Sequence, residues 1–259
     1  MKQIIITPIK SLNADFQITT RQVAQNLTSN DLWIICLDSS TDTTKYEIEK
    51  VASEFIQPDQ YKVINSNLRK FAGNTRNSAI DFIKNIPFPY ILSFLDADDF
   101  IHENYSQIIK KNFLKRQYGI ISFSYERHKS GDVKIVKHKD VTLPYENFIY
   151  NYNAGCLATS VFIRNEYDLN AARFGSRKRA NDQKYFLDAV RYFGEITYKS
   201  DVVATYNINR GSLSHKKYKM PIYKFLALID HGIPIIKSLH ILVYYIVAGI
   251  RRHFLGKEI

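Results

Sequence analysis

A chain of 259 residues has room for one large α/β domain and a modest extension, because domains run to roughly 100 to 200 residues. Hydrophobic residues make up 45% of it and charged residues 24%, a balance that excludes an intrinsically disordered chain. The net charge of +11 at pH 7 indicates an anionic partner, which could be nucleic acid, a membrane surface or a phosphate-bearing substrate.

Strands and helices are expected to alternate in the first half of the chain. Short apolar runs predict buried strands, and amphipathic patterns predict the helices between them. We expect strands at 2–8, 32–37, 61–64 and 90–95. Each strand is followed by a helix, and these helices are expected at 15–27, 45–55, 75–86 and 103–115. Asp15 is a candidate cap for the first helix. The alternation predicts a mostly parallel sheet whose ligand lies at the carboxyl ends of its strands.

The second half of the chain is expected to be more mixed. Residues 119–125 and 133–136 predict two strands joined by a turn, because Ser130-Gly131-Asp132 lies between them. Further strands are expected at 157–163 and 202–208, and a helix at 181–192.

The tail from residue 220 to residue 259 is apolar but broken by polar residues. A membrane-spanning helix needs about 20 mostly apolar residues, whereas the uninterrupted run at 241–250 covers half of that length. Arg251 and Arg252 follow the run directly and would suit anionic lipid headgroups. We therefore expect an amphipathic helical tail in peripheral contact with an anionic membrane.

Cysteine usage bears on the compartment of the protein. Cys36 and Cys156 each lie within an apolar stretch rather than in paired spacing, and both are expected to be core residues. With no disulfide framework, and with a sequence that opens directly on a strand, we expect a cytoplasmic protein that lies at the inner face of the cell membrane.

Three carboxylates follow the fourth predicted strand, in the segment Asp96-Ala97-Asp98-Asp99. Carboxylates at the end of a buried strand repel one another unless a cation is present, so they indicate a site for a hard divalent ion such as Mn²⁺ or Mg²⁺. The alternative is a solvated loop in which Asp99 lies near the start of a helix.

Four segments, in this order along the chain, resemble the family 2 inverting glycosyltransferases: residues 4–8 (IIITP), 38–43 (DSSTDT), 73–79 (GNTRNSA) and 94–99 (FLDADD). The resemblance covers most of residues 1–215. It implies an α/β GT-A fold, which is a Rossmann-like and mostly parallel central sheet flanked by helices. That domain would span residues 1–219, with a nucleotide-sugar half at 1–115, an acceptor half at 116–219, and the tail at 220–259.

The resemblance also implies a donor site at the carboxyl ends of the strands. In it, Asp38 would accept hydrogen bonds from the base, Asp96 would hold the ribose and Asp98 would bind the metal, while Asp99 stays unassigned. Arg76 would lie nearby, where its guanidinium can pair with acidic residues of the pocket and lie against the base or the diphosphate. The alternative for Arg76 is a plain helix-surface arginine. The full set of expected donor contacts is Thr7, Pro8, Asp38, Arg76, Asp96, Ala97, Asp98 and Arg210.

An inverting transfer needs one base, and the resemblance places it at Asp182. Asn181 stands where the family has glutamate, and the alternative for Asp182 is a helix cap. Further along, residues 209–215 resemble the loop that closes over the diphosphate, in which Arg210 would contact phosphate. His215 would bind the metal there, or else be merely solvated. The loops at 7–10 and 38–40 depart from the usual family sequences.

These features together predict an inverting glycosyltransferase. It would move a sugar from a nucleotide-diphosphate donor, a UDP-sugar in the first instance, to a hydroxyl of a saccharide or lipid-linked glycan at the cell surface. One rival is a metal-dependent phosphohydrolase or phosphotransferase with an aspartate nucleophile, which leaves Asp38, Arg76 and Asp182 unused. The other rival is a basic nucleic-acid-binding protein, but no recognition motif supports it and no nucleic-acid partner is expected.

Overall fold

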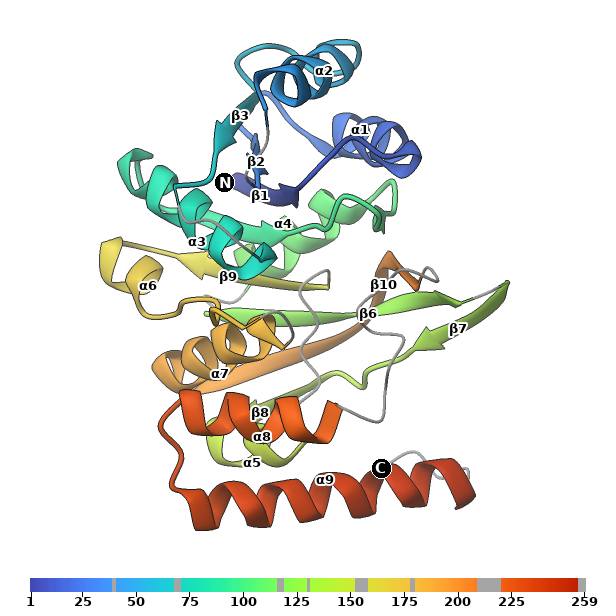
Figure 1. Cartoon of the computed structure of the whole chain (residues 1–259), viewed down its shortest axis with the longest axis vertical. Coiled ribbons are helices and arrows are strands. Elements are labelled where there is room, and N and C mark those ends of the chain that lie inside the picture. Colours follow the sequence, from blue (N-terminus) through green and yellow to red (C-terminus); the bar gives the residue numbers. More distant parts are fainter. Residues whose placement is uncertain are drawn as a thin grey trace.

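The computed structural model describes residues 1–38, 41–67, 71–115, 119–129, 131–151, 158–177, 180–208 and 220–255. A single twisted sheet runs through the molecule, and helices pack on it (Figure 1). Its strands are β1 Lys2–Ile9, β2 Leu32–Leu37, β3 Tyr61–Asn65, β4 Tyr90–Phe94, β5 Phe100–Ile101, β6 Ile120–Lys129, β7 Asp132–Val136, β8 Val141–Pro144, β9 Thr159–Ile163 and β10 Glu195–Ile208. The helices are α1 Ala14–Asn26, α2 Asp42–Ser53, α3 Ala72–Phe82, α4 Tyr105–Lys115, α5 Tyr145–Asn151, α6 Glu166–Asn170, α7 Asn181–Phe193, α8 Met220–Asp230 and α9 Ile235–Leu255.

The strands follow the order β3-β2-β1-β4-β9-β6-β10-β5, with β7 paired to β6 and β8 paired to β10. Strands β5, β7, β8 and β9 run opposite to the others, so the sheet is mixed but mostly parallel, as expected. The predicted β6–β7 hairpin is confirmed.

The register brings the ends of β1, β2 and β4 to one edge of the sheet. Ile9 of β1 is opposite Leu37, the last residue of β2, and Ile6 is opposite Phe94, the last residue of β4. The chain therefore leaves β2 and β4 on the same side as it leaves β1. Loops that follow parallel strands meet at such an edge, and a ligand site is expected there.

Two apolar cores lie on the two faces of the sheet. Alternate residues of β1 serve both, since Ile4 and Ile6 join one core while Ile5 and Ile9 join the other. Helices α3 and α7 cover the first core, and α1 and α4 cover the second. Strand β2 is buried along its whole length, which explains its continuous apolar sequence, and Cys36 within it is a core residue as predicted.

The helix boundaries needed correction. The cap of α1 is Asn13 rather than Asp15, because the extended backbone at Asn13 lets its side-chain oxygen accept the N–H of Phe16 at 2.8 Å. Helix α2 begins at Asp42 behind a Thr41 cap, and α3 ends at Phe82 and continues as a short 3₁₀ turn, Ile83–Asn85. The elements that sequence did not predict include β5, β8, α5 and α6, all of them short.

The tail is helical, as expected, and it packs against the domain. Leu228 of α8, Ile233 in the segment between the two helices, and Ile241 of α9 are buried members of the first core. Across the described part of the chain, no helix combines the length and the hydropathy that crossing a membrane requires.

The buried carboxylate of Asp31 connects three segments of the fold. Asp31 is 3% exposed and accepts hydrogen bonds from the backbone N–H groups of Gln3 and Thr28, each at 2.8 Å. It also pairs with Lys110 of α4, whose Nζ lies 2.5 Å from Oδ2. This one side chain therefore joins β1, the loop before β2 and α4.

We expect Asp31→Ala to lower the free energy of unfolding by about 3 kcal/mol, because it leaves an ammonium group and buried N–H donors without their acceptor. Urea denaturation measures the change. Asp59→Ala, at an exposed position, is the matched control and should stay within about 0.5 kcal/mol of the parent. Equal stabilities of the two variants would contradict the role given to Asp31.

Candidate functional site

The acidic segment after β4 forms a turn that is held on two sides. The N–H of Asp99 donates to the carbonyl oxygen of Asp96 at 3.1 Å, which closes the turn. On one side, the Thr19 hydroxyl of α1 donates to the carbonyls of Ala97 and Asp99, both at 3.2 Å. On the other, Asn207 of β10 donates its N–H to the Asp99 carboxylate at 2.9 Å and its side-chain amide to the Asp98 carbonyl at 2.7 Å. The carboxylates are thus presented by a fixed backbone.

Arg76 is buried beside this turn. It is 3% exposed, forms an ion pair with Asp96 and donates to Oδ1 of Asn181 at 3.3 Å. Its alternative as a helix-surface arginine is therefore wrong, and its expected pairing with an acidic residue of the site is confirmed. Because Asn181 opens α7, one guanidinium connects the turn after β4 with the first turn of α7.

The Arg76 guanidinium packs on a cluster of aromatic rings. The Arg76 Cζ lies 5.1 Å from the ring centroid of Phe174, within the range of a cation–π contact. Phe174 stacks on Tyr185 of α7, with ring centroids 4.4 Å apart, and meets Phe94 of β4 edge to face at 4.9 Å. Strand β4, which leads to Asp96, and helix α7, which begins with Asn181, therefore both contribute rings to the aromatic cluster on which Arg76 packs.

Close approach of α3 and α7 depends on a glycine. A Cβ atom on Gly73 would lie 2.5 Å from the carbonyl oxygen of Gly175 and 2.9 Å from Cβ of Asn181, both closer than packed atoms allow. The N–H of Gly175 in turn donates to the Asn181 carbonyl at 2.9 Å. Asn181 is thus engaged inside the protein with Arg76 and this glycine contact.

Asp182 lies in the first turn of α7, directly after Asn181. The cap position is taken by Ala180, in the left-handed region at φ 55°, so Asp182 is not the cap residue that the alternative required. Burial raises the pKa of the Asp182 carboxyl above its usual value, although nearby Arg76 lowers it, and Asp96 raises it again. Asp182 is therefore within electrostatic reach of both Arg76 and Asp96.

The acidic turn resists full ionisation. Burial and the neighbouring Asp96 raise the pKa of Asp98 to about 6, and Asp15 of α1 adds to the effect. The pKa of Asp99 is raised well above its usual value by burial and by the charges of Asp96 and Asp98. A bound cation would relieve this repulsion.

Of the three carboxylates, Asp98 is the best placed to bind a cation. Asp96 is paired with Arg76 and Asp99 with the Asn207 amide, whereas Asp98 is half-buried and repelled by its neighbours. No group of three or more His, Cys, Asp or Glu among the described residues is arranged to hold a metal. Mg²⁺ and similar hard ions commonly use one or two carboxylates together with substrate phosphates, and Asp98 fits that pattern.

The other expected donor residues lie at the same edge of the sheet. The Thr7 hydroxyl is fully buried and accepts a hydrogen bond from the Trp33 indole at 2.8 Å, and Pro8 beside it is buried as well. Asp38 is half-buried and follows β2, with its N–H donated to the Ile9 carbonyl at 2.8 Å. Two expected site residues, Arg210 and His215, lie outside the described residues.

Sequence reasoning missed the residues that hold the site in place. Thr19 and Asn207 bind the backbone of the acidic turn, and Phe174 lies under Arg76. None of them belongs to a motif, and their only sequence signal is polarity or aromaticity near a predicted element. Contacts across 70 or more positions, such as Thr19 to Ala97 at a separation of 78, leave no local pattern.

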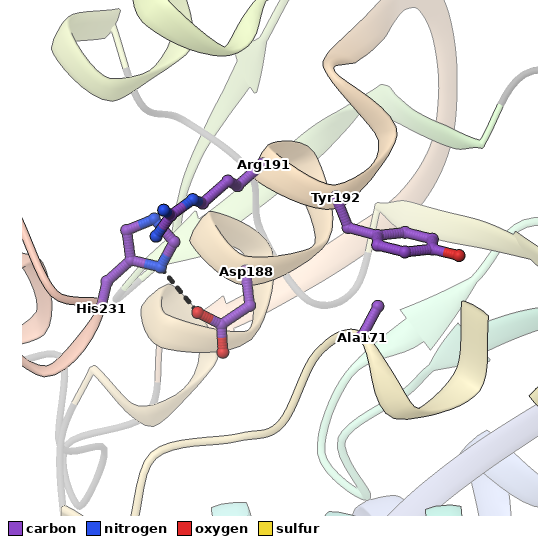
Figure 2. Close-up of a pocket in the computed structure, with 5 residues that line it drawn as sticks. All are labelled: Ala171, Asp188, Arg191, Tyr192 and His231. Atoms are coloured by element: carbon purple, nitrogen blue, oxygen red, sulfur yellow. Dashed lines mark hydrogen bonds and ion pairs between the residues drawn. The ribbon is translucent and has the colours of Figure 1, made fainter. Parts of the chain in front are cut away.

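A pocket lies further along α7, on the side that faces the tail. Asp188, Arg191 and Tyr192 of α7 line it together with Ala171 and His231 (Figure 2). His231 Nδ1 lies 2.6 Å from Asp188 Oδ1 and its Nε2 lies 2.8 Å from the Tyr145 hydroxyl. The helix that begins with Asn181 and Asp182 is thus bound to the segment between α8 and α9.

Comparisons with known proteins agree with this geometry. Residues 5–186 match the model of the family described as Glycosyl transferase family 2. Over 254 residues the chain is 23% identical to UDP-Glc:alpha-D-GlcNAc-diphosphoundecaprenol beta-1,3-glucosyltransferase WfgD of Escherichia coli, covering 96% of this chain and 94% of that protein.

Solved structures show the same fold. S. aureus TarS 1–349 in complex with UDP-GlcNAc superposes with a TM-score of 0.70 at 16% identity, covering 98% of this chain and 73% of that one. The mannosyltransferase PcManGT from Pyrobaculum calidifontis, in complex with GDP-Man and Mn²⁺, gives a TM-score of 0.64 at 14% identity, with coverages of 92% and 69%. The expected GT-A fold is confirmed.

We expect Arg76→Ala to reduce the free energy of unfolding at pH 7 by about 3 kcal/mol, because buried carboxylates lose their cation. Without Arg76, the pKa of Asp182 should rise further. A carboxyl whose folded-state pKa is raised binds its proton more readily in the folded state, so the deficit should shrink as the pH falls towards 5.

Urea denaturation at both pH values measures this effect. Arg21→Ala removes an exposed arginine that also lies over an aromatic ring, that of Phe55, and serves as the control. A deficit for Arg76→Ala that does not change with pH would contradict the electrostatic role.

Proposed function

The chain belongs to glycosyl transferase family 2, and from that membership we propose that it transfers a sugar, with inversion, from a nucleotide-diphosphate donor to a glycan hydroxyl. One observation carries the proposal. The buried guanidinium of Arg76 holds the acidic turn, where the donor phosphates would lie, next to the first turn of α7, where Asp182 would act as base. This arrangement would keep the donor phosphates and the base of an inverting displacement beside each other.

The proposed donor is a UDP-sugar. TarS, with UDP-GlcNAc, and WfgD, whose name specifies UDP-Glc, support this choice over a GDP-sugar such as that bound to PcManGT. Asp38 would accept hydrogen bonds from the base, while Thr7 and Pro8 would shape the pocket wall. Asp96 would hold the ribose beside Ala97, and Arg210 would contact the diphosphate.

A divalent ion, Mn²⁺ or Mg²⁺, would be held by Asp98, with His215 as a second proposed ligand. The ion would neutralise the negative charge that develops on the leaving diphosphate. The protein itself would contribute the fixed backbone of the turn, so that the Asp98 carboxylate need not be ordered when the donor binds.

Asp182 would accept the proton of the acceptor hydroxyl as that oxygen bonds to the anomeric carbon. On the opposite face, the bond between the anomeric carbon and the diphosphate oxygen breaks, and the nucleoside diphosphate leaves. A raised pKa makes Asp182 a stronger base than an ordinary aspartate. Arg76 would keep the carboxylate ionised when it is required to act.

The proposed acceptor is a lipid-linked saccharide, as part of cell-surface polysaccharide synthesis. WfgD, whose length this chain covers almost entirely, is named for an acceptor on diphosphoundecaprenol, and the net charge of +11 suits a diphosphate-bearing substrate. Residues 1–115 would bind the donor and 116–219 the acceptor. The tail at 220–259 would place the protein peripherally at the inner face of the membrane.

Family membership supports sugar transfer over the rival functions. A phosphohydrolase with an aspartate nucleophile would give no role to the Arg76 bridge to α7.

We expect Asp182→Asn to retain donor binding and to lower kcat for sugar transfer about a hundredfold or more, because the amide cannot accept the proton. Transfer is measured by release of nucleoside diphosphate, and donor binding by calorimetry. Asp59→Asn is the matched control. Substantial transfer by Asp182→Asn would rule out this base.

We expect UDP with Mn²⁺ to raise the Tm of the protein more than UDP alone, and Asp98→Ala to remove that metal-dependent increment. Since the pKa of Asp98 is raised to about 6, protonation should compete with the cation below that pH, and the increment should fall between about pH 7.5 and about pH 5.5. An increment in Asp98→Ala equal to that of the parent protein would refute the assignment of the ligand.

A further inference from the structure

Helix α9 presents a continuous apolar stripe to solvent. The stripe consists of large aliphatic side chains that are between 40% and 84% exposed: Ile235, Ile236, Leu239, Val243, Ile246, Val247 and Ile250. Their spacings of three and four residues place them on one face of the helix. At 1.5 Å per residue, the stripe extends over roughly 24 Å. Scattered exposed aliphatics are ordinary, but a patch of this extent marks an interaction site.

The opposite face of α9 is fixed to the protein, so the stripe points outward. Ser238, Ile241 and Ala248 are buried against the domain. Lys237 pairs with Glu146 of α5, with Nζ and Oε2 3.1 Å apart, and the Tyr150 ring of α5 contacts His240 edge to face. In Figure 1, α9 lies along one end of the molecule, opposite the end that carries α2 and β3.

The charges on α9 indicate what covers the stripe. Arg251, Arg252 and His253 follow the stripe in the sequence of the helix, and no acidic residue lies between positions 231 and 257. A second copy of this chain docked through the same stripe would bring like charges together, at an energetic cost. Anionic lipid headgroups would instead pair with them while the aliphatic side chains enter the acyl region.

We propose that α9 lies in the plane of an anionic membrane and that its stripe is the lipid-binding surface of the protein. None of the described helices is suited to span the bilayer, and α9 is held flat against the domain by α5. This inference deepens the proposed function, and it rests on that function only in assigning the acceptor to the same membrane.

The orientation of the site follows from this surface. Helices α5 and α8 both contact α9, and α7, which begins with Asp182, packs against both α5 and α8. The acceptor half would therefore lie nearer to the lipid, and the donor half would face away from it. A soluble nucleotide sugar and a membrane-bound acceptor would reach Asp182 from opposite directions.

Point substitutions test the surface better than truncation does, because α8 and α9 also supply Leu228 and Ile241 to the core. The test variant is Ile236→Glu combined with Val243→Glu, both at exposed stripe positions. The matched control is Leu114→Glu combined with Val133→Glu, which changes two exposed aliphatic residues of α4 and β7 in the same way. Circular dichroism and Tm establish that each variant is folded.

The full-length protein is sedimented with phosphatidylcholine vesicles, with and without phosphatidylglycerol. We expect the parent protein and the control to bind the anionic vesicles, and the stripe variant to lose at least about tenfold in affinity. Unchanged binding by the stripe variant would overturn the proposal. So would a parent protein that ignores vesicles and forms a dimer that the stripe substitutions dissociate, since a second copy would then cover the stripe.

Failure of the proposed function is distinguished by Asp182→Asn, which should bind vesicles like the parent protein while losing transfer. The stripe variant should show the converse. It should hydrolyse the donor, or transfer its sugar to a water-soluble acceptor, at the rate of the parent protein, but it should transfer less sugar to an acceptor embedded in vesicles.

Discussion

The ion pair between Arg76 and Asp96 is the interaction on which the site depends. A buried guanidinium is tolerated only where its charge is compensated and its N–H groups find acceptors. Asp96 compensates the charge, Asn181 accepts a hydrogen bond and the Phe174 ring lies beneath. These partners come from the turn after β4, from α7 and from the segment before it. Because Arg76 contacts all of these partners at once, it fixes how these parts of the chain lie relative to one another.

The surrounding architecture makes that compensation possible. Parallel pairing of β1 with β2 and β4 delivers the acidic turn to the edge of the sheet, and Thr19 and Asn207 hold its backbone there. Gly73 lets α3 approach α7 closely enough for Arg76 to reach Asn181. Asp96, which pairs with Arg76, repels Asp98 and Asp99, and this repulsion adds to burial in raising the pKa of both carboxyls.

Sequence patterns predicted the regular parts of this arrangement and missed the parts that depend on distant partners. The apolar run at 32–37 is buried on both faces and became β2 without any shift of its ends. Strand β5 has two residues, too few for any periodicity, and exists because Ile101 pairs with Ala204 of β10. Asn13 and Asp15 are both good caps by residue type, and only the extended backbone at Asn13 decides between them. For Arg76, the motif indicated an acidic partner, but Asn181, 105 positions away, could come only from the fold.

The contact between His231 and α7 has a consequence for folding. Asp188 of α7 accepts from His231 and from Lys184, and Arg177, just before α7, pairs with Asp230 at the end of α8. Since Leu228 and Ile241 also belong to the first core, the tail and α7 share both polar and apolar contacts. They should therefore unfold as one cooperative unit, and amide hydrogen exchange in the middle of α7 should change together with that of α8 when either helix is destabilised. The C-terminal helices thus belong to the same cooperative unit as α7 rather than forming an appendage.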